Sequence, residues 1–153
     1  MTKPKRMINS QIILKAFLNV LPSEPGWVVI HSSIIHLNIS GDDFKWEFLK
    51  IVKNLVERGY TLALPAFTFS FCSKGYFDPL KSKSEVSILA DWAMELYDST
   101  RTKHPIYSHV LIGPNAKEAL EASTISCCGK ESIYQFFERE NATICMLGIG
   151  WHA

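Results

Sequence analysis

Three short apolar segments constrain the fold of this chain more than any other feature. Residues 27–30, 61–65 and 143–148 are mostly apolar, and the second and third end in Pro65 and Gly148. Runs of this length are typical of strands that are buried on both faces, as in the sheets of α/β proteins. The sequence therefore predicts three buried strands of one sheet.

Helical patterns lie between and around these strands. Their apolar residues recur at spacings of three and four, which places them on one helix face. Helices are predicted near residues 10–20, 44–55, 87–97 and 133–137, with a shorter one opened by Pro114 and Asn115. Asp42 and Asp43 can cap the second helix, Ser132 can cap the helix near 133–137, and Gly59 can end the second. Residues 27–64 thus form a strand–helix–strand unit, for which parallel pairing is expected.

The order of these elements predicts an α/β fold, with a layered sheet of largely parallel strands flanked by helices. A further strand is predicted at 108–112, whereas the aromatic-rich stretch from Ala66 to Lys83 lacks a helical period and is predicted to be a loop. No element follows the strand at 143–148, so we expect a truncated layer. Its last strand should expose apolar surface and promote self-association.

Composition excludes several classes of protein. The 153 residues include 16 Lys and Arg and 15 Asp and Glu, a net charge of +1 that offers no field for nucleic acid or an anionic membrane. No apolar stretch approaches the roughly 20 residues of a membrane helix, and the basic start lacks a cleavage site. The four cysteines have neither zinc nor disulfide spacing. We therefore expect a cytoplasmic protein with free thiols, no metal, and no nucleic-acid or membrane partner.

Four short blocks of the sequence carry further information through their order. They are Val29–Ser33, Leu64–Thr68, His104–Ser108 and Met146–Gly150, with Asp78–Pro79 and Ser84–Glu85 between the second and third. Together they resemble the aminoglycoside 3-N-acetyltransferase family. The resemblance runs from about Trp27 to the end of the chain and implies that residues 1–153 are the amino-terminal part of a single acetyltransferase domain.

The resemblance implies an activity and a cofactor. The family transfers an acetyl group from acetyl-CoA, used as co-substrate without a metal, to an amine of an aminoglycoside or other amino sugar. Such a protein would take part in antibiotic resistance, and its partner would be a small-molecule amine. We therefore expect an acetyl-CoA-dependent N-acetyltransferase.

Two of the blocks are implied to lie against the coenzyme. His31, Ser32 and Ser33 follow the first strand, and ligands of α/β sheets usually bind at such strand ends. Short hydroxyls and backbone N–H groups can donate to amide or phosphate oxygens. The family also places the block containing His104 and Ser108 near CoA. The alternative is that the serines satisfy backbone groups in turns and that His104 is structural.

The loop from Ala66 to Lys83 is expected to form a wall of the acceptor pocket. Aromatic rings would shape this wall, and Thr68, Asp78 and Glu85 would bind the substrate, the two carboxylates holding a cationic amino sugar. The alternative is an aromatic mini-core with solvated carboxylates.

No catalytic residue is assigned within the chain. Acetyl transfer needs a base, and in the resembled family this base is a histidine, supported by a carboxylate, beyond the strand that corresponds to residues 146–148. His152 stands too early to match it, and Cys72 and Cys145 have no activating setting. The alternative to an acetyltransferase is therefore a catalytically inactive fragment that retains CoA binding or acts as an interaction module.

Overall fold

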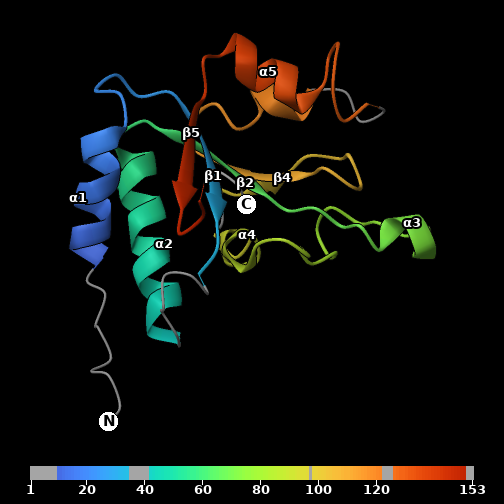
Figure 1. Cartoon of the computed structure of the whole chain (residues 1–153), viewed down its shortest axis with the longest axis horizontal. Coiled ribbons are helices and arrows are strands. Elements are labelled where there is room, and N and C mark those ends of the chain that lie inside the picture. The colour runs from blue at the N-terminus through green and yellow to red at the C-terminus, as the bar shows by residue number, and fades with distance from the viewer. Residues whose placement is uncertain (1–9, 35–41, 97, 122–125, 151–153) are drawn as a thin grey trace.

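The computed structural model describes residues 10–34, 42–96, 98–121 and 126–150. Its centre is a five-stranded sheet with helices on both faces (Figure 1). The strands are β1 (Trp27–Ser32), β2 (Thr61–Pro65), β3 (Thr100–Arg101), β4 (His109–Ile112) and β5 (Thr143–Leu147). The helices are α1 (Ser10–Val20), α2 (Asp42–Glu57), α3 (Phe71–Lys74), α4 (Ile88–Ala93), the 3₁₀ helix η1 (Glu118–Glu121) and α5 (Ile133–Arg139).

The sheet has the strand order β3-β4-β2-β1-β5. β1 pairs in parallel with β2 and β5, whereas β4 is antiparallel to both β2 and β3. Among these five strands, β4 alone therefore opposes the common direction. The predicted α/β class, the largely parallel sheet and the parallel pairing of the first two strands are confirmed.

Both faces of the sheet are covered because side chains alternate along each strand. In β1, Val28 and Ile30 pack into a core cluster with residues of α1, α2 and α4, while Trp27 and Val29 pack into a second cluster with α5 and η1. Figure 1 shows α1 and α2 side by side, with α5 across the sheet from them. We call the α5 side of the sheet the second face.

The ends of the helices agree in part with those predicted from the sequence. Gly59 follows α2 with a φ of 93°, as predicted, and the Ser132 hydroxyl accepts from the Gln135 N–H at 3.2 Å and caps α5. The side chains of Asp42 and Asp43 lie outside the described residues. Pro114 and Asn115 open a turn rather than a helix, and the short η1 follows it from Glu118; α4 is also shorter than predicted.

The loop after β2 differs slightly from the prediction. It contains the single turn α3, closed by Gly75, whose N–H donates to the Phe71 carbonyl at 2.8 Å. One turn is too short to produce a helical period, so the sequence pattern could not reveal it. The rest of the segment up to Lys83 is irregular, as predicted.

Further expectations concern cysteines, metals and membranes. All four cysteines are free, as predicted, with Cys145 buried in β5 and Cys72 exposed. Across the described ranges, no three His, Cys, Asp or Glu side chains are grouped to hold a metal ion. Within the same ranges, no helix combines the length and the apolar character that a membrane span requires.

Candidate ligand site at the carboxyl end of the sheet

The carboxyl end of β1 is held by two neighbouring elements. The Ser33 N–H donates to the Leu147 carbonyl at 2.9 Å, which fixes this end against β5. The hydroxyls of Ser32 and Ser87 lie 3.2 Å apart and join β1 to the start of α4. His31 is half-buried, and its burial lowers the pKa of the imidazole, which favours the neutral form. The three predicted coenzyme residues therefore occupy a rigid strand end.

A second histidine lies in the same row of the sheet. His109 of β4 is the register partner of Pro65, and continuing the β1–β2 register by two residues places His31 on the other side of Pro65. His109 is fully buried, and its pKa is lowered to about 3, mainly by burial and to a smaller extent by the charge of His31. This effect of His31 on His109 supports the proximity of the two imidazoles. We call His31, Pro65 and His109 the histidine row.

The tautomer of the His109 ring follows from the one hydrogen bond that the ring makes to the described residues. Its Nδ1 lies 3.2 Å from the Tyr107 carbonyl oxygen, so the proton resides on Nδ1. Its Nε2 is then a buried acceptor, and it has no hydrogen-bond partner among the described residues. The second face thus contains a neutral histidine with an unused acceptor.

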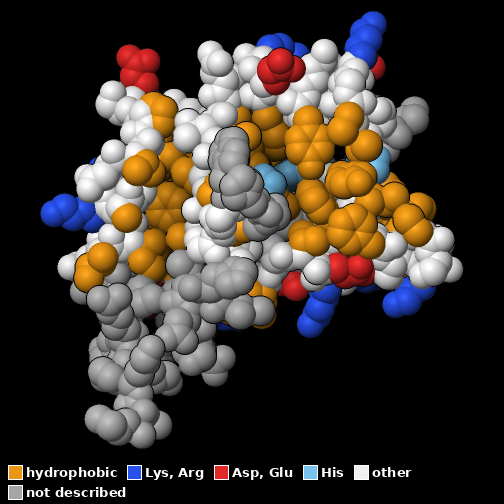
Figure 2. Space-filling view, viewed as in Figure 1, with side chains coloured by type: hydrophobic (Ala, Val, Ile, Leu, Met, Phe, Trp, Pro, Cys, Tyr) orange, Lys and Arg blue, Asp and Glu red, His pale blue; other side chains and the backbone are white. Residues whose placement is uncertain are grey.

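Aromatic rings connect this row to the two neighbouring loops. The His109 ring is 5.6 Å from Phe67, 5.6 Å from Tyr134 and 5.3 Å from Phe137. Phe67 in turn lies 5.1 Å from Tyr107. Figure 2 shows hydrophobic side chains gathered around histidine side chains on this side of the molecule. The loop after β2, the segment before β4 and α5 therefore meet over the second face.

His104 belongs to the edge of this network. Its ring is 5.8 Å from that of Tyr107, and its Nδ1 accepts from the Tyr107 N–H at 3.0 Å. Its partial burial lowers its pKa, so the ring is held neutral inside its own turn. One ring nitrogen remains available for a ligand.

Ser108 and Thr68 lie deeper than the other predicted residues. Ser108 is fully buried, and its hydroxyl donates to the Ala66 carbonyl at 2.8 Å and accepts from Arg101 Nε at 3.1 Å. Thr68 is also buried, and its hydroxyl accepts from Arg101 Nη2 at 2.9 Å and donates to the Lys83 carbonyl at 3.4 Å. Both hydroxyls are therefore buried and form hydrogen bonds that hold the loop in place.

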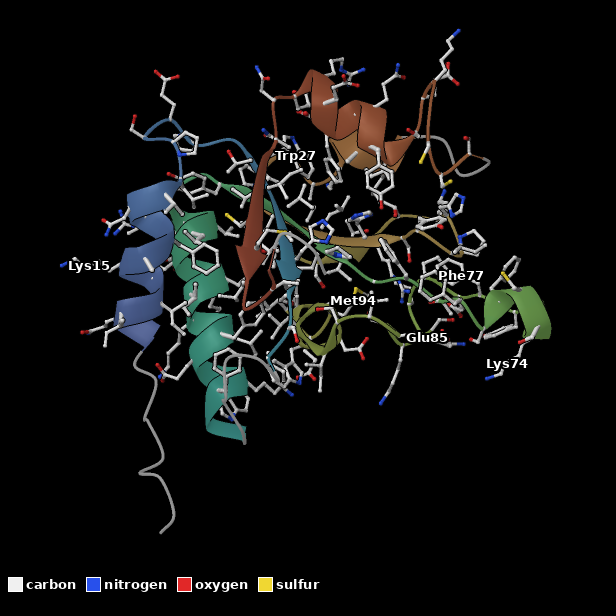
Figure 3. All side chains as sticks on the ribbon, viewed as in Figure 1. Lys15, Trp27, Lys74, Phe77, Glu85 and Met94 are labelled. Carbon is white, nitrogen blue, oxygen red and sulfur yellow. The ribbon has the colours of Figure 1, made fainter. Side chains whose placement is uncertain are left out.

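The predicted acceptor carboxylates bind the loop itself. Asp78 Oδ1 accepts from the Leu80 N–H at 2.9 Å, and the Glu85 carboxylate accepts from the Ser70 N–H at 3.1 Å. Hydrogen bonding with Ser70 is the main cause that lowers the pKa of Glu85. Figure 3 shows Glu85 near Phe77, on the side of the molecule that carries α3. Because Glu85 is exposed, its carboxylate keeps acceptor capacity toward solvent.

Comparison with known families identifies the family to which this chain belongs. The sequence model described as aminoglycoside 3-N-acetyltransferase matches residues 12–153. The chain belongs to this family. The predicted resemblance is therefore confirmed, and it covers the whole sheet. A search of the curated proteins gave no match.

Solved structures of acetyltransferases share the fold. The chain superposes on the apoenzyme of aminoglycoside acetyltransferase AAC(3)-IVa with a TM-score of 0.76 and 19% identity, covering 97% of this chain and 57% of that one. Sisomicin-bound AAC-VIa gives 0.76 and 16% identity, covering 94% and 60%. The binary complex of AAC-IIIb with CoASH gives 0.74 and 13% identity, covering 91% and 59%. The chain thus spans about three fifths of the length of these enzymes.

Within this acetyltransferase family fold, the eight predicted site residues separate into two groups. His31, His104 and Glu85 retain exposed or half-exposed polar atoms, as do three further members, Ser32, Ser33 and Asp78. Ser108 and Thr68 are buried behind the loop. Sequence reasoning missed Arg101 and His109, because neither carries a local pattern that distinguishes it from an ordinary strand or loop residue.

A pocket of about 330 Å³ lies elsewhere, between residues 79–83 and α4. None of the predicted site residues lines it. Its side chains include Leu80, Ile88 and Trp92. Two of its carboxylates are already engaged, since Asp91 accepts from the Ser84 N–H at 2.8 Å and Glu95 pairs with Lys45 at 2.6 Å. We therefore place the candidate site at the histidine row and not in this pocket.

Proposed function

We propose that this chain contains the coenzyme-binding and acceptor-binding parts of an acetyl-CoA-dependent N-acetyltransferase that acts on an amine of an aminoglycoside or other amino sugar. One observation supports this most strongly: in a chain of this family, the end of β1, the loop after β2 and the segment before β4 converge on the carboxyl end of the sheet. The segments come from distant parts of the sequence, and together they can contact two small molecules at once.

The end of β1 is the proposed coenzyme side. The neutral imidazole of His31 and the hydroxyls of Ser32 and Ser33 can exchange hydrogen bonds with the amide groups of the pantetheine arm. The Ser33 N–H already binds β5, so the hydroxyl and not the backbone of this residue is available. A strand end held on both sides can position such a ligand with little loss of entropy.

The aromatic loop after β2 is the proposed acceptor side. Phe67 and Phe69 present rings whose centroids are 6.0 Å apart, and such surfaces shape pockets for small ligands. Because Asp78 and Glu85 also hold the loop, their capacity to bind a cationic amine is partial. The proposed acceptor is therefore an amine for which ring contacts contribute as much as charge.

The chemistry defines what these residues do. The amine nitrogen attacks the thioester carbonyl and gives its proton to a base, the carbon–sulfur bond breaks, and the departing thiolate takes up a proton to leave as the thiol. We assign no base in this chain. Its described residues would bind and orient the two reactants, and orientation alone can lower such a barrier greatly.

Two further proposals follow from this activity. Acetylation of an aminoglycoside would place the protein in antibiotic resistance. The use of acetyl-CoA, together with four free cysteines, supports a cytoplasmic location.

Binding of acetyl-CoA tests the proposal directly. We expect the full chain to bind acetyl-CoA in isothermal titration, and Ser33→Ala to weaken binding by about 3- to 10-fold, the effect of one hydrogen bond. The matched control is Ser23→Ala, an exposed serine on the approach to β1, which should leave the affinity unchanged. No binding by the wild-type chain, or equal weakening by both variants, would contradict the proposal.

One observation supports the alternative of an interaction module. Ile144 and Met146 of β5 are 64% and 38% exposed, as expected for the last strand, and in the described part of the chain β5 pairs with β1 alone. An open strand edge with apolar side chains favours pairing with a second copy. We propose that β5 mediates self-association of this chain.

Replacing Ile144 by lysine tests this association. We expect Ile144→Lys to shift the chain toward monomer in sedimentation velocity, because a charge at the edge opposes strand pairing. Ile12→Lys is the matched control, since Ile12 is similarly exposed at 68% but lies on α1. A wild-type chain that stays monomeric at high concentration, or an equal response of the two variants, argues against the proposal.

A further inference from the structure

Arg101 is a buried cation whose side chain contacts the loop after β2, the proposed acceptor side. It lies in β3 and is 4% exposed. Its Nη1 donates to the Ser82 carbonyl, and its Nη2 donates to the Ala66 carbonyl and, at 2.9 Å, to the Thr68 hydroxyl. Its Nε donates to the Ser108 hydroxyl at 3.1 Å. One side chain thus contacts four residues of three different segments.

The guanidinium is held by neutral groups rather than by a carboxylate. Its carbon lies 5.1 Å from the centre of the Phe77 ring, and in the described part of the chain no carboxylate comes within 4.0 Å of it. Burial is the main effect on its pKa and lowers it, while the more distant Asp91 opposes this shift. A guanidinium remains charged in proteins, so its carbonyl partners must compensate for lost water. Such a costly arrangement indicates a specific structural task.

The partners of Arg101 show what that task is. Ala66 begins the loop after β2 and Ser82 lies near its end, so one guanidinium ties the two ends together. Closing a loop of this length costs conformational entropy, which these bonds offset. Between the two ends, the ring of Phe67 extends toward Tyr107 and His109. The position of the aromatic rings therefore depends on the side chain of Arg101.

We propose that Arg101 is a positioning residue for acceptor binding: it holds residues 66–85 in the shape that faces the histidine row. This inference rests on the proposed function, in which this loop binds the acceptor amine. Lysine cannot replace arginine here, because one ammonium group cannot reach carbonyls and hydroxyls that are spread over a planar fork.

The experiment compares Arg101→Lys, Arg101→Met and Ser108→Ala in the full chain. Amide hydrogen exchange reports the order of the loop, with the N–H groups of Ser70 and Glu85 as probes, since they bind Glu85 and Phe67. Isothermal titration with kanamycin as an amino-sugar probe and with acetyl-CoA reports the two ligand sites. A further variant, Arg101→Ala, is used only for rescue: ethylguanidinium is added to it at millimolar concentration to refill the vacated site.

We expect both Arg101 replacements, lysine included, to accelerate exchange in residues 66–85 at least tenfold while amides of β1 and β2 stay protected. Kanamycin affinity should fall at least tenfold, and acetyl-CoA affinity less than twofold. Ethylguanidinium should restore kanamycin binding to Arg101→Ala. Ser108→Ala removes only one partner of Arg101, so it should fold and show a smaller change in the same direction, with acetyl-CoA affinity retained.

Other results would overturn the inference. Unchanged loop exchange in Arg101→Lys and Ser108→Ala would show that the guanidinium does not order the loop. Equal losses of both ligands would show a general structural role, and a selective loss of acetyl-CoA binding in Ser108→Ala would return Ser108 to the coenzyme site. If the wild-type chain binds acetyl-CoA but not kanamycin, the assignment of the acceptor fails and Arg101 is no acceptor-positioning residue. If it binds neither ligand, the proposed function itself fails.

Discussion

Gly113→Ala should lower the free energy of unfolding by about 3 kcal/mol or more, because the added methyl group meets backbone and not flexible side chains. Gly113 follows β4 with a φ of 129°, a conformation that residues with a Cβ rarely adopt. A Cβ built there lies 2.6 Å from the Tyr60 carbonyl oxygen and 2.7 Å from Thr61 Cα. Neither atom can retreat without displacing the start of β2.

Gly113→Ala should also affect the candidate site, because the turn at Gly113 helps to set the register between β4 and β2. The Asn115 N–H donates to the Thr61 hydroxyl at 3.1 Å, so the same turn aligns β4 with β2. This alignment places His109 opposite Pro65. Urea denaturation followed by tryptophan fluorescence measures the loss of stability. The control is Gly26→Ala, where the added Cβ meets nothing within 4 Å; equal stability of the two variants would refute the steric argument.

Acidification should destabilise the chain strongly because of His109. Burial lowers its pKa to about 3 in the folded protein, whereas an unfolded histidine titrates near 6.5. Between these values the unfolded state binds the proton and the folded state does not. The stabilisation is therefore complete above pH 6.5 and is lost progressively as the pH falls toward 3, at a limiting slope of about 1.4 kcal/mol per pH unit. His31 and His104 act in the same direction.

A variant separates His109 from other acid-sensitive groups. His109→Gln removes the titrating ring but can still donate to the Tyr107 carbonyl. We expect its free energy of unfolding to fall less steeply between pH 6.5 and 4 than that of the wild type, in urea melts at four pH values. His104→Gln is the control, and it should keep most of the wild-type slope. Parallel profiles for wild type and His109→Gln would exclude His109 as the main acid-sensitive group.

The protonation state of the two histidines also affects the proposed binding of an amine. The Nε2 of His109 is a buried acceptor without a partner in the described part of the chain, and an unsatisfied group of this kind typically costs about 1–3 kcal/mol. A neutral row of His31 and His109 adds no positive charge near a cationic acceptor. Protonation of the half-buried His31 at acidic pH would add such a charge and should weaken amine binding.

The elements of this fold were predictable because their signals are local. The apolar runs at residues 27–30, 61–65 and 143–148 became β1, β2 and β5, and the helix between the first two ended at Gly59 as expected. The family could be identified for the same reason, since its blocks are short and lie in a fixed order. By contrast, the two-residue β3 and the one-turn α3 are too short to carry a periodic signal.

The sequence by itself therefore determined the α/β class, the buried strands, the family and the strand end at His31–Ser33. Only the tertiary structure revealed the contacts of Arg101, Ser108 and His109, because each has partners that are distant in the sequence. Arg101 reaches Ala66 across 35 positions, and the same side chain donates to the Ser108 hydroxyl, a contact that no local pattern in the sequence predicts. Periodicity records which face of an element is buried, but it does not record which side chain a buried charge will meet.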